Sequence, residues 1–164
     1  MTNKEFFLKR FAGEKKVFAR VFAAVPEEHR DYKPDPKSKT AVELSATIAS
    51  EIADLAVLVK QGTVDHSAGM PPRPGTMPEI VALFETGATA LDAVLASTTD
   101  EEWENKTLTA IYPMGKWESK MFDICWGLLF DVVHHRGQLS TYLRAMGGKV
   151  PSIYGPSADS APEM

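Results

Sequence analysis

Three side chains with metal-binding groups, Glu51, Asp131 and His135, fall on or beside the apolar faces of two predicted helices. On a helical wheel of about 100° per residue, Glu51 and His135 lie roughly 40–45° from the centres of their apolar stripes. Asp131 lies one turn before His135, and residues four apart project from the same helical face. Carboxylates and imidazoles are common ligands of divalent cations in helical bundles. The pattern therefore predicts a cation held by these three residues in the bundle interior.

A structural alternative stays open for the same residues. An unpaired carboxylate in a protein core is costly, so Glu51 needs a partner or must change its protonation state. His135 would supply that partner in a buried structural pair, whereas a bound cation would supply it in a metal centre. The adjacent His134 falls roughly 140° from the stripe and is expected on the surface.

Further candidates lie on the last helix and on the segment before it. Tyr142 shares the helical face of the candidate ligands, and with Tyr112 and Trp117 it is expected to line the mouth of a pocket. Cys125 lies within the apolar stripe and is expected to be inert, because a reactive thiol needs exposure and a positive neighbour. Arg136, near the edge of the stripe, is expected to pair with a carboxylate or a carbonyl of the C-terminal tail.

Four segments with helical periodicity must position these groups. The first covers about residues 4–24. The second runs from a capping box at residues 40–43 to Gly62, and the third starts at a similar Thr-x-x-Glu box at residues 76–79. The fourth covers about residues 119–146 and ends at two glycines.

The connections between these segments differ in character. Residues 61–75 contain three prolines and are predicted to form a long crossover loop. Residues 99–103 favour one short helical turn. Residues 107–112 and 116–118 are β-prone and flank a turn signal, which predicts a small hairpin or extended excursion.

The predicted fold class is all-α. It is a four-helix bundle with one long crossover loop and a small hairpin or extended insertion before the last helix. Residues 1–148 are expected to form the bundle, and residues 149–164 an extended tail packed on it or trailing from it.

Composition restricts the function. The chain has 164 residues and a net charge of −4, so the basic surplus of a general nucleic-acid binder is missing. No uninterrupted apolar run reaches the ~18–20 residues of a membrane span, and no signal peptide is visible. The single cysteine fits a reducing compartment, so we expect a cytoplasmic protein that contacts neither nucleic acid nor membranes.

Three segments resemble a known family. Residues 134–144 (HHRGQLSTYLR) and 150–157 (VPSIYGPS) strongly resemble the bacterial DinB family of damage-inducible proteins, and residues 43–49 (ELSATIA) resemble its second-helix motif. The resemblance implies a four-helix bundle, usually a homodimer, with a divalent metal pocket.

The resemblance also implies where the metal ligands lie. Family members typically use one histidine on the second helix and two histidines four apart on the fourth, and these positions are Thr47, Asp131 and His135 here. His135 keeps the family residue, Asp131 is a plausible ligand, and Glu51 could substitute for Thr47 from the same helix. A mixed carboxylate and imidazole set suits Zn, Ni, Mn or Fe.

Two functions from different classes follow. The first is a metal-dependent enzyme, either a hydrolase or a thiol S-transferase that uses a low-molecular-weight thiol, as some relatives in the family do. The second is a non-catalytic dimeric protein, related to stress or binding a small molecule, that has lost the family metal.

Overall fold

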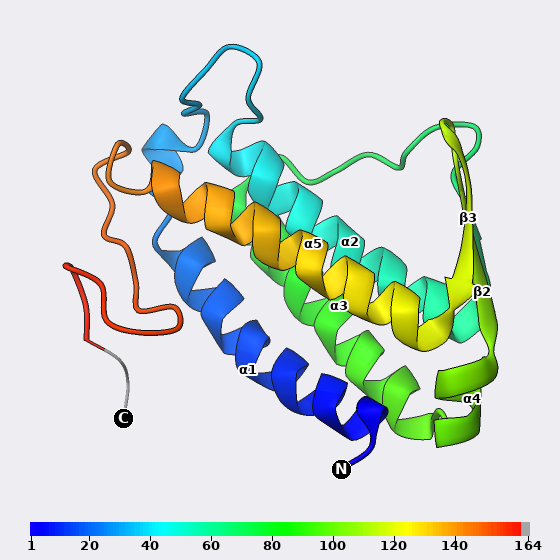
Figure 1. Ribbon diagram of the computed structural model, residues 1–164. Coiled ribbons are helices and arrows are strands. Elements are labelled where there is room, and N and C mark those ends of the chain that lie inside the picture. The colour runs from blue at the N-terminus through cyan, green and yellow to red at the C-terminus, as the bar shows by residue number, and fades with distance from the viewer. Residues whose placement is uncertain (162–164) are drawn as a thin grey trace.

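The computed structural model describes residues 1–161. Most of these residues are helical, in five α-helices and one short 3-10 helix, and a three-stranded sheet completes the fold (Figure 1). The helices are α1 (Asn3–Ala23), α2 (Ala41–Gln61), α3 (Met77–Ser97), α4 (Asp100–Asn105) and α5 (Met121–Tyr142), with the 3-10 helix at Glu27–His29. The strands are β1 (Thr63–Asp65), β2 (Thr107–Tyr112) and β3 (Gly115–Lys120).

The helices begin where the sequence places capping residues. The hydroxyl of Thr40 accepts from the backbone of Glu43, whose carboxylate accepts from the backbone of Thr40, and Thr76 and Glu79 form the same box. Four orphan N–H groups at each helix start make such caps stabilising. At the other end of α2, Gly62 has φ +81°, a left-handed conformation that favours glycine.

The four long helices lie side by side (Figure 1), and the backbones of α2 and α3 come close together at Gly87. A Cβ atom built on Gly87 would lie 2.8 Å from Cα of Ala53, so the glycine permits this contact between helix backbones. The aromatic residues of α1 fill the adjacent core, where Phe18 and Phe22 pack against Phe84 of α3.

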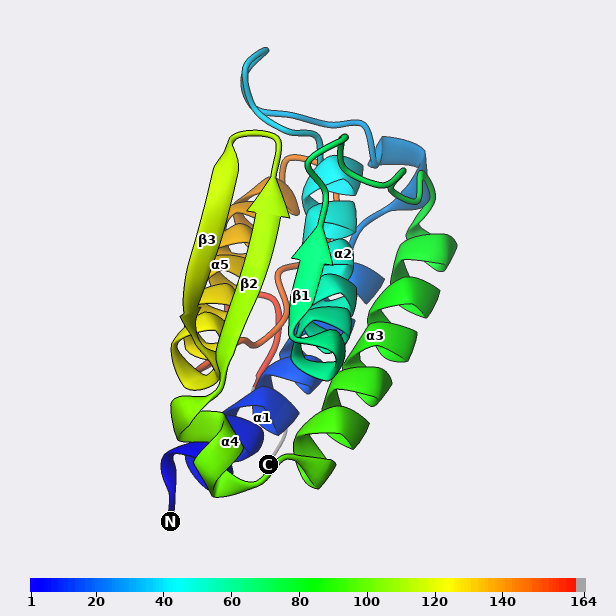
Figure 2. The ribbon, with the colours of Figure 1, turned by 90° about the vertical axis from the view of Figure 1, so that its right-hand side faces the viewer.

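The sheet corrects the all-α prediction. Strands β2 and β3 form the expected antiparallel hairpin, but β1 lies within the predicted crossover loop and pairs with β2 in parallel. Figure 2 shows the sheet in front of α2 and α5. The partner of β1 lies more than 40 residues along the chain, for example Val64 opposite Ala110, so a local hydrophobic pattern carries no sign of the pairing.

The last helix is shorter than predicted. It ends at Tyr142 and continues as turns to Gly147, which has φ +79°. The described tail residues return along the protein, where Ser152 is buried and Asp159 pairs with Arg144. The last residues of the predicted tail, 162–164, lie outside the described residues, and the division of the chain at residue 148 stays a prediction.

Helix α3 is apolar enough to meet an averaged membrane-span criterion. Its mean hydropathy reaches 1.5 over 18 residues, of which 33% are buried inside the protein. The core helices of soluble proteins meet the same criterion, and Ile80, Leu91 and Leu95 of α3 are fully buried. This single helix is therefore only weak evidence for a membrane span.

Candidate functional site

Packing of α5 against α2 brings the three predicted ligands together. One ligand atom each from Glu51, Asp131 and His135 lies within 4.8 Å of the other two. Asp131 and His135 stand on consecutive turns of α5, and Oδ2 of Asp131 is 3.6 Å from Nε2 of His135. The cluster thus contains two carboxylates and one imidazole, a donor set that suits a divalent cation.

The orientation of His135 is fixed from the same helix. Its Nδ1 lies 2.9 Å from the side-chain oxygen of Gln138, one turn further on. When Nδ1–H donates to that oxygen, the other ring nitrogen, Nε2, keeps its lone pair on the side of Asp131. Such a second hydrogen bond is the usual way in which proteins hold a metal-binding histidine in one tautomer.

One carboxylate oxygen of Glu51 lacks a hydrogen-bond partner in the described part of the chain. Its Oε2 is buried and has no hydrogen-bond partner within residues 1–161. Burial and, to a smaller extent, the nearby charge of Asp131 raise the pKa of Glu51 to about 7, against the opposite effect of Arg73 and Lys39. A buried acceptor without a partner is costly, so this oxygen is free to bind a proton or a cation.

The cluster lies at the wall of a cavity, whereas the sequence predicts it in the interior of the bundle. The side chain of Asp131 is 51% exposed and that of His135 is 17% exposed. The buried face of α5 differs from the predicted stripe, because Arg136 is fully buried while Leu128 is only half-buried. Asp131 and His135 lie at the edge of the helix packing, and Asp131 faces the cavity.

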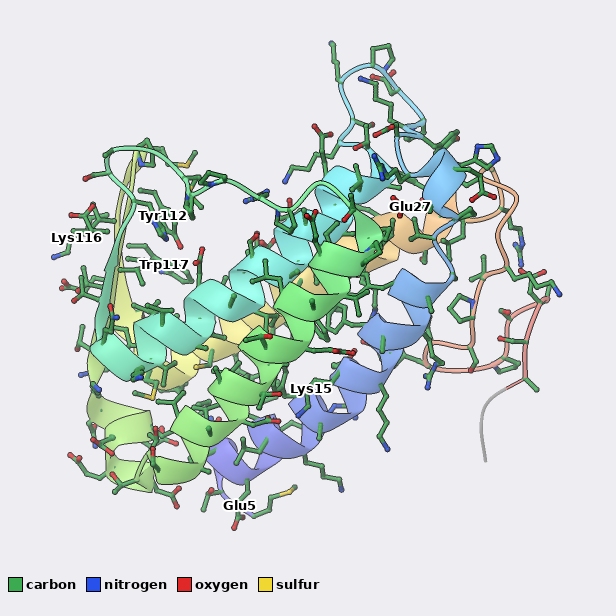
Figure 3. All side chains as sticks on the ribbon, turned by 180° about the vertical axis from the view of Figure 1, so that it is seen from behind. Glu5, Lys15, Glu27, Tyr112, Lys116 and Trp117 are labelled. Carbon is green, nitrogen blue, oxygen red and sulfur yellow. The ribbon has the colours of Figure 1, made fainter. Side chains whose placement is uncertain are left out.

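A cavity of about 460 Å³ adjoins the cluster, and Glu51 and Asp131 form part of its wall. Its other walls are the C-terminal half of α2, strand β1, the 66–76 loop, the hairpin and α5. Tyr112 and Trp117 project from the sheet toward the helices, whereas Lys116 points away from them (Figure 3). The lining is mostly apolar, and the volume lies within the range of small-molecule sites.

Tyr112 and Trp117 therefore lie where the sequence predicts a pocket mouth, but Tyr142 does not. Tyr142 is buried, its ring packs edge-on against Tyr32 at 5.7 Å, and its hydroxyl lies 3.4 Å from the carbonyl oxygen of Lys39. Tyr142 stands about two turns beyond His135 on α5, where Tyr32 and Lys39 of the segment before α2 cover the helix.

A second polar pair stands beside the cavity. Asp54, three residues after Glu51, lines the cavity, and its Oδ2 lies 3.5 Å from Nε2 of His66. Desolvation by burial raises the pKa of Asp54. The ring of His66 also packs against Tyr112, with centroids 5.9 Å apart. The sequence indicated no role for His66, although the spacing of Asp54 from Glu51 places both on one side of α2.

Two basic side chains contact Thr47, which lies one turn before Glu51 on α2. Its hydroxyl oxygen accepts hydrogen bonds from Lys39 Nζ at 3.1 Å and Arg73 Nη1 at 2.5 Å, and its hydroxyl donates to the carbonyl of Glu43 at 2.8 Å. A hydroxyl has two lone pairs and one proton, so Thr47 has no capacity left for a metal ion. The loop of Arg73 carried no signal in the sequence beyond its prolines.

Arg136, the neighbour of His135, has a structural role. It is 1% exposed, pairs with the buried Glu14 of α1 and donates to the Tyr154 hydroxyl at 2.6 Å. That hydroxyl donates in turn to the other oxygen of Glu14 at 2.9 Å. The guanidinium also lies 4.8 Å from the centroid of Phe18. The motif arginine thus joins α1, α5 and the tail, with a carboxylate partner as predicted.

Comparison with known proteins gives the family. The model of the DinB family matches residues 1–164, the whole chain. The chain belongs to the DinB family. A search of curated proteins gives no match.

Two solved DinB-like structures have the same fold. A DinB-like protein from Bacillus cereus ATCC 10987 aligns with a TM-score of 0.74 at 20% identity, over 92% of this chain and 97% of the other. A DinB-like protein from Bacillus subtilis aligns with a TM-score of 0.68, also at 20% identity, over 87% and 93% of the two chains. At this identity the similarity establishes a DinB-like fold. The chemistry of each protein has to be inferred from its own residues.

Proposed function

We propose that this DinB-family protein binds a divalent cation between Glu51, Asp131 and His135 and is a metal-dependent enzyme for a small molecule in the adjoining cavity. In this proposal the four long helices act as a four-helix bundle that holds the ion on its sheet-covered side. The unpartnered, buried Oε2 of Glu51 carries the argument, because a purely structural Glu–His pair would satisfy that oxygen.

The donor chemistry also supports a cation. Two carboxylate oxygens and a histidine nitrogen, the latter oriented by Gln138, suit Zn, Mn, Fe or Ni. Bound there, such a cation supplies Lewis acidity, which polarises a substrate oxygen and lowers the pKa of a water or thiol. Glu51 and Asp131 together bring two negative charges, which balance the charge of a divalent ion.

The protein's own residues narrow the reaction class. Cys125 is fully buried, and burial raises the pKa of its thiol, so the protein has no thiolate of its own to act as nucleophile. We therefore propose either hydrolysis or transfer to an external low-molecular-weight thiol. In both, the Asp54–His66 pair is placed beside the cavity to accept a proton from the nucleophile. A homodimer and a cytoplasmic location stay predictions.

Metal analysis tests the proposal. Protein purified without chelator is expected to contain about one equivalent of a transition metal, or to take one up in calorimetric titration after chelation. Glu51→Gln and His135→Gln each remove one donor at similar size and are expected to weaken binding at least about tenfold. His134→Gln is the matched control, because this neighbouring histidine is exposed and outside the cluster.

The outcomes separate the two functions. Absence of any metal uptake by the wild-type protein would refute the metal centre and leave the non-catalytic alternative. With metal bound, hydrolysis and thiol-transfer assays on small esters, amides and epoxides are expected to show turnover that Asp131→Asn abolishes. Turnover that is unchanged in Asp131→Asn and His135→Gln would show that the activity arises elsewhere.

A further inference from the structure

Lys39 and Arg73 approach Thr47 from two different segments and meet at one oxygen atom. Lys39 comes from the residues before α2, and Arg73 comes from the 66–76 loop, 26 residues after Thr47. Within residues 1–161 neither cation makes an ion pair, although both lie close enough to lower the pKa of Glu51. Both donate to a neutral hydroxyl, that of Thr47, which leaves most of their N–H groups available.

The position of Arg73 connects this pair to the cavity. Arg73 lines the 460 Å³ cavity beside Glu51 and Asp131, and together with Lys39 it lines a neighbouring hollow of about 370 Å³. Prolines on both sides of Arg73 restrict the loop backbone, and Tyr142 contacts the carbonyl of Lys39. Both cations are thus held near the cavity and near the proposed ion.

Charge balance indicates what these cations would bind. A divalent ion neutralises the carboxylates of Glu51 and Asp131, which leaves the positive charges of Lys39 and Arg73 uncompensated at the edge of the same site. Like charges brought together repel, and an anion between them relieves the repulsion. Guanidinium and ammonium groups recognise carboxylates and phosphates through charge-assisted hydrogen bonds.

We propose that Lys39 and Arg73 form an anion subsite, so that the substrate is a small molecule with a carboxylate or phosphate group and an apolar body. The inference rests on the proposed function, because it assigns the substrate class of that same site. The anionic group lies between the two cations, and the apolar body contacts Leu55, Leu58, Leu128 and Trp117 in the cavity. The substrate's reactive group then faces the cluster of Glu51 and Asp131.

Binding of simple amphiphiles tests the subsite without an activity assay. The probes are hexanoate, hexyl phosphate, hexanol and hexylamine, which share one apolar body and differ in the head group. Calorimetry on metal-loaded wild-type protein is expected to give at least about tenfold tighter binding of an anionic probe than of hexanol, with hexylamine weakest. A tighter hexyl phosphate identifies a phosphate ester as the substrate type, and a tighter hexanoate identifies a carboxylate.

Variants assign the effect to the two cations. Arg73→Gln and Lys39→Gln are each expected to remove most of the anion preference and to leave hexanol binding and metal content unchanged. Arg73→Lys is expected to retain part of the preference. Lys60→Gln, which removes an exposed charge elsewhere on α2, is the matched control and should have no effect.

Three results would overturn or separate the proposals. Equal binding of hexanoate, hexyl phosphate and hexanol overturns the subsite, as does an anion preference that persists in the double variant Lys39→Gln/Arg73→Gln, since the anion would then bind the metal itself. The same titrations on metal-free protein separate the two proposals. A wild-type protein that takes up no metal, yet loses its anion preference in Arg73→Gln, refutes the metal centre and supports the subsite.

Discussion

Oδ2 of Asp131 lies 3.6 Å from Nε2 of His135, one turn further along α5. A protonated histidine paired with a carboxylate and a neutral histidine sharing a cation with it would both fit this geometry. Glu51 separates the two explanations, because an Asp–His pair leaves its buried Oε2 without a partner, and a cation supplies one.

The affinity for a divalent cation should depend on pH through Glu51. Because burial raises its pKa to about 7, a proton competes with the cation below that pH. The dissociation constant is expected to fall about tenfold for each pH unit between pH 5 and 7 and to level off above pH 7. Glu51→Gln should bind more weakly and with a shallower slope in calorimetry at several pH values. An unchanged slope would assign the competing proton to another group.

The stability of the metal-free protein should fall as the pH rises from about 4.5 to 7. The pKa of Glu51 is raised from 4.5 in the reference state to about 7, so the folded protein bears the cost of ionisation above pH 7 and none below 4.5. In urea unfolding at pH 8 with chelator, Glu51→Gln is expected to be about 1–3 kcal/mol more stable than wild type.

Two comparisons control this experiment. At pH 4.5 Glu51→Gln should match the wild type, and Glu85→Gln, at an exposed carboxyl of α3, should have little effect at either pH. Saturating cation should reverse the order at pH 8, because only the wild type gains from binding. A metal-free Glu51→Gln protein that is less stable at pH 8 would show that the carboxylate has a partner.

Gly87→Ala should destabilise the contact between α2 and α3. The new methyl group would lie 2.8 Å from Cα of Ala53, a backbone atom that cannot move without shifting the helix. Chemical denaturation is expected to show a loss of about 1–3 kcal/mol, as for overpacked cores. Gly13→Ala is the matched control in α1: nothing lies within 4 Å of its Cβ, so the better helix former should stabilise the protein by up to about 1 kcal/mol. Equal effects at both sites would contradict the close approach.

Arg136→Ala should strongly destabilise the protein, because it leaves the charge of Glu14 buried without its buried cationic partner. The expected loss of unfolding free energy is about 3–5 kcal/mol, and Glu14→Gln combined with Arg136→Met should recover much of it. Tyr154→Phe removes one hydroxyl from the network and should cost about 1 kcal/mol. Limited proteolysis should then cut the tail of this variant faster. Arg144→Ala, at an exposed ion pair, should change stability much less.

The features that could be predicted from the sequence depend on local signals. Capping boxes and hydrophobic periods belong to single helices, so α2 and α3 start where Thr40 and Thr76 indicate. The cluster could also be predicted. The helical wheels place Glu51, Asp131 and His135 on or beside the inner faces of α2 and α5, and these faces meet once the two helices are taken as neighbours.

The features that could not be predicted are contacts between distant segments. The burial of Arg136 depends on Glu14, 122 residues earlier, and a hydrophobic pattern does not place a charged residue on the buried face of α5. Strand β1 is three residues long and has a distant partner. Arg73 reaches Thr47 only because its loop crosses from the sheet to α3, a path that no pattern within the loop encodes.

The parallel pairing of β1 with β2 also has an evolutionary consequence. Strand β1 anchors the start of the 66–76 loop to the hairpin, so this loop can change its length and side chains while the helices that carry Glu51, Asp131 and His135 keep their packing. Selection can therefore act on the chemistry of the ligand separately from that of the ion. Members of the family with one conserved scaffold would then diverge first in this loop, and its residues should distinguish proteins of different substrate preference.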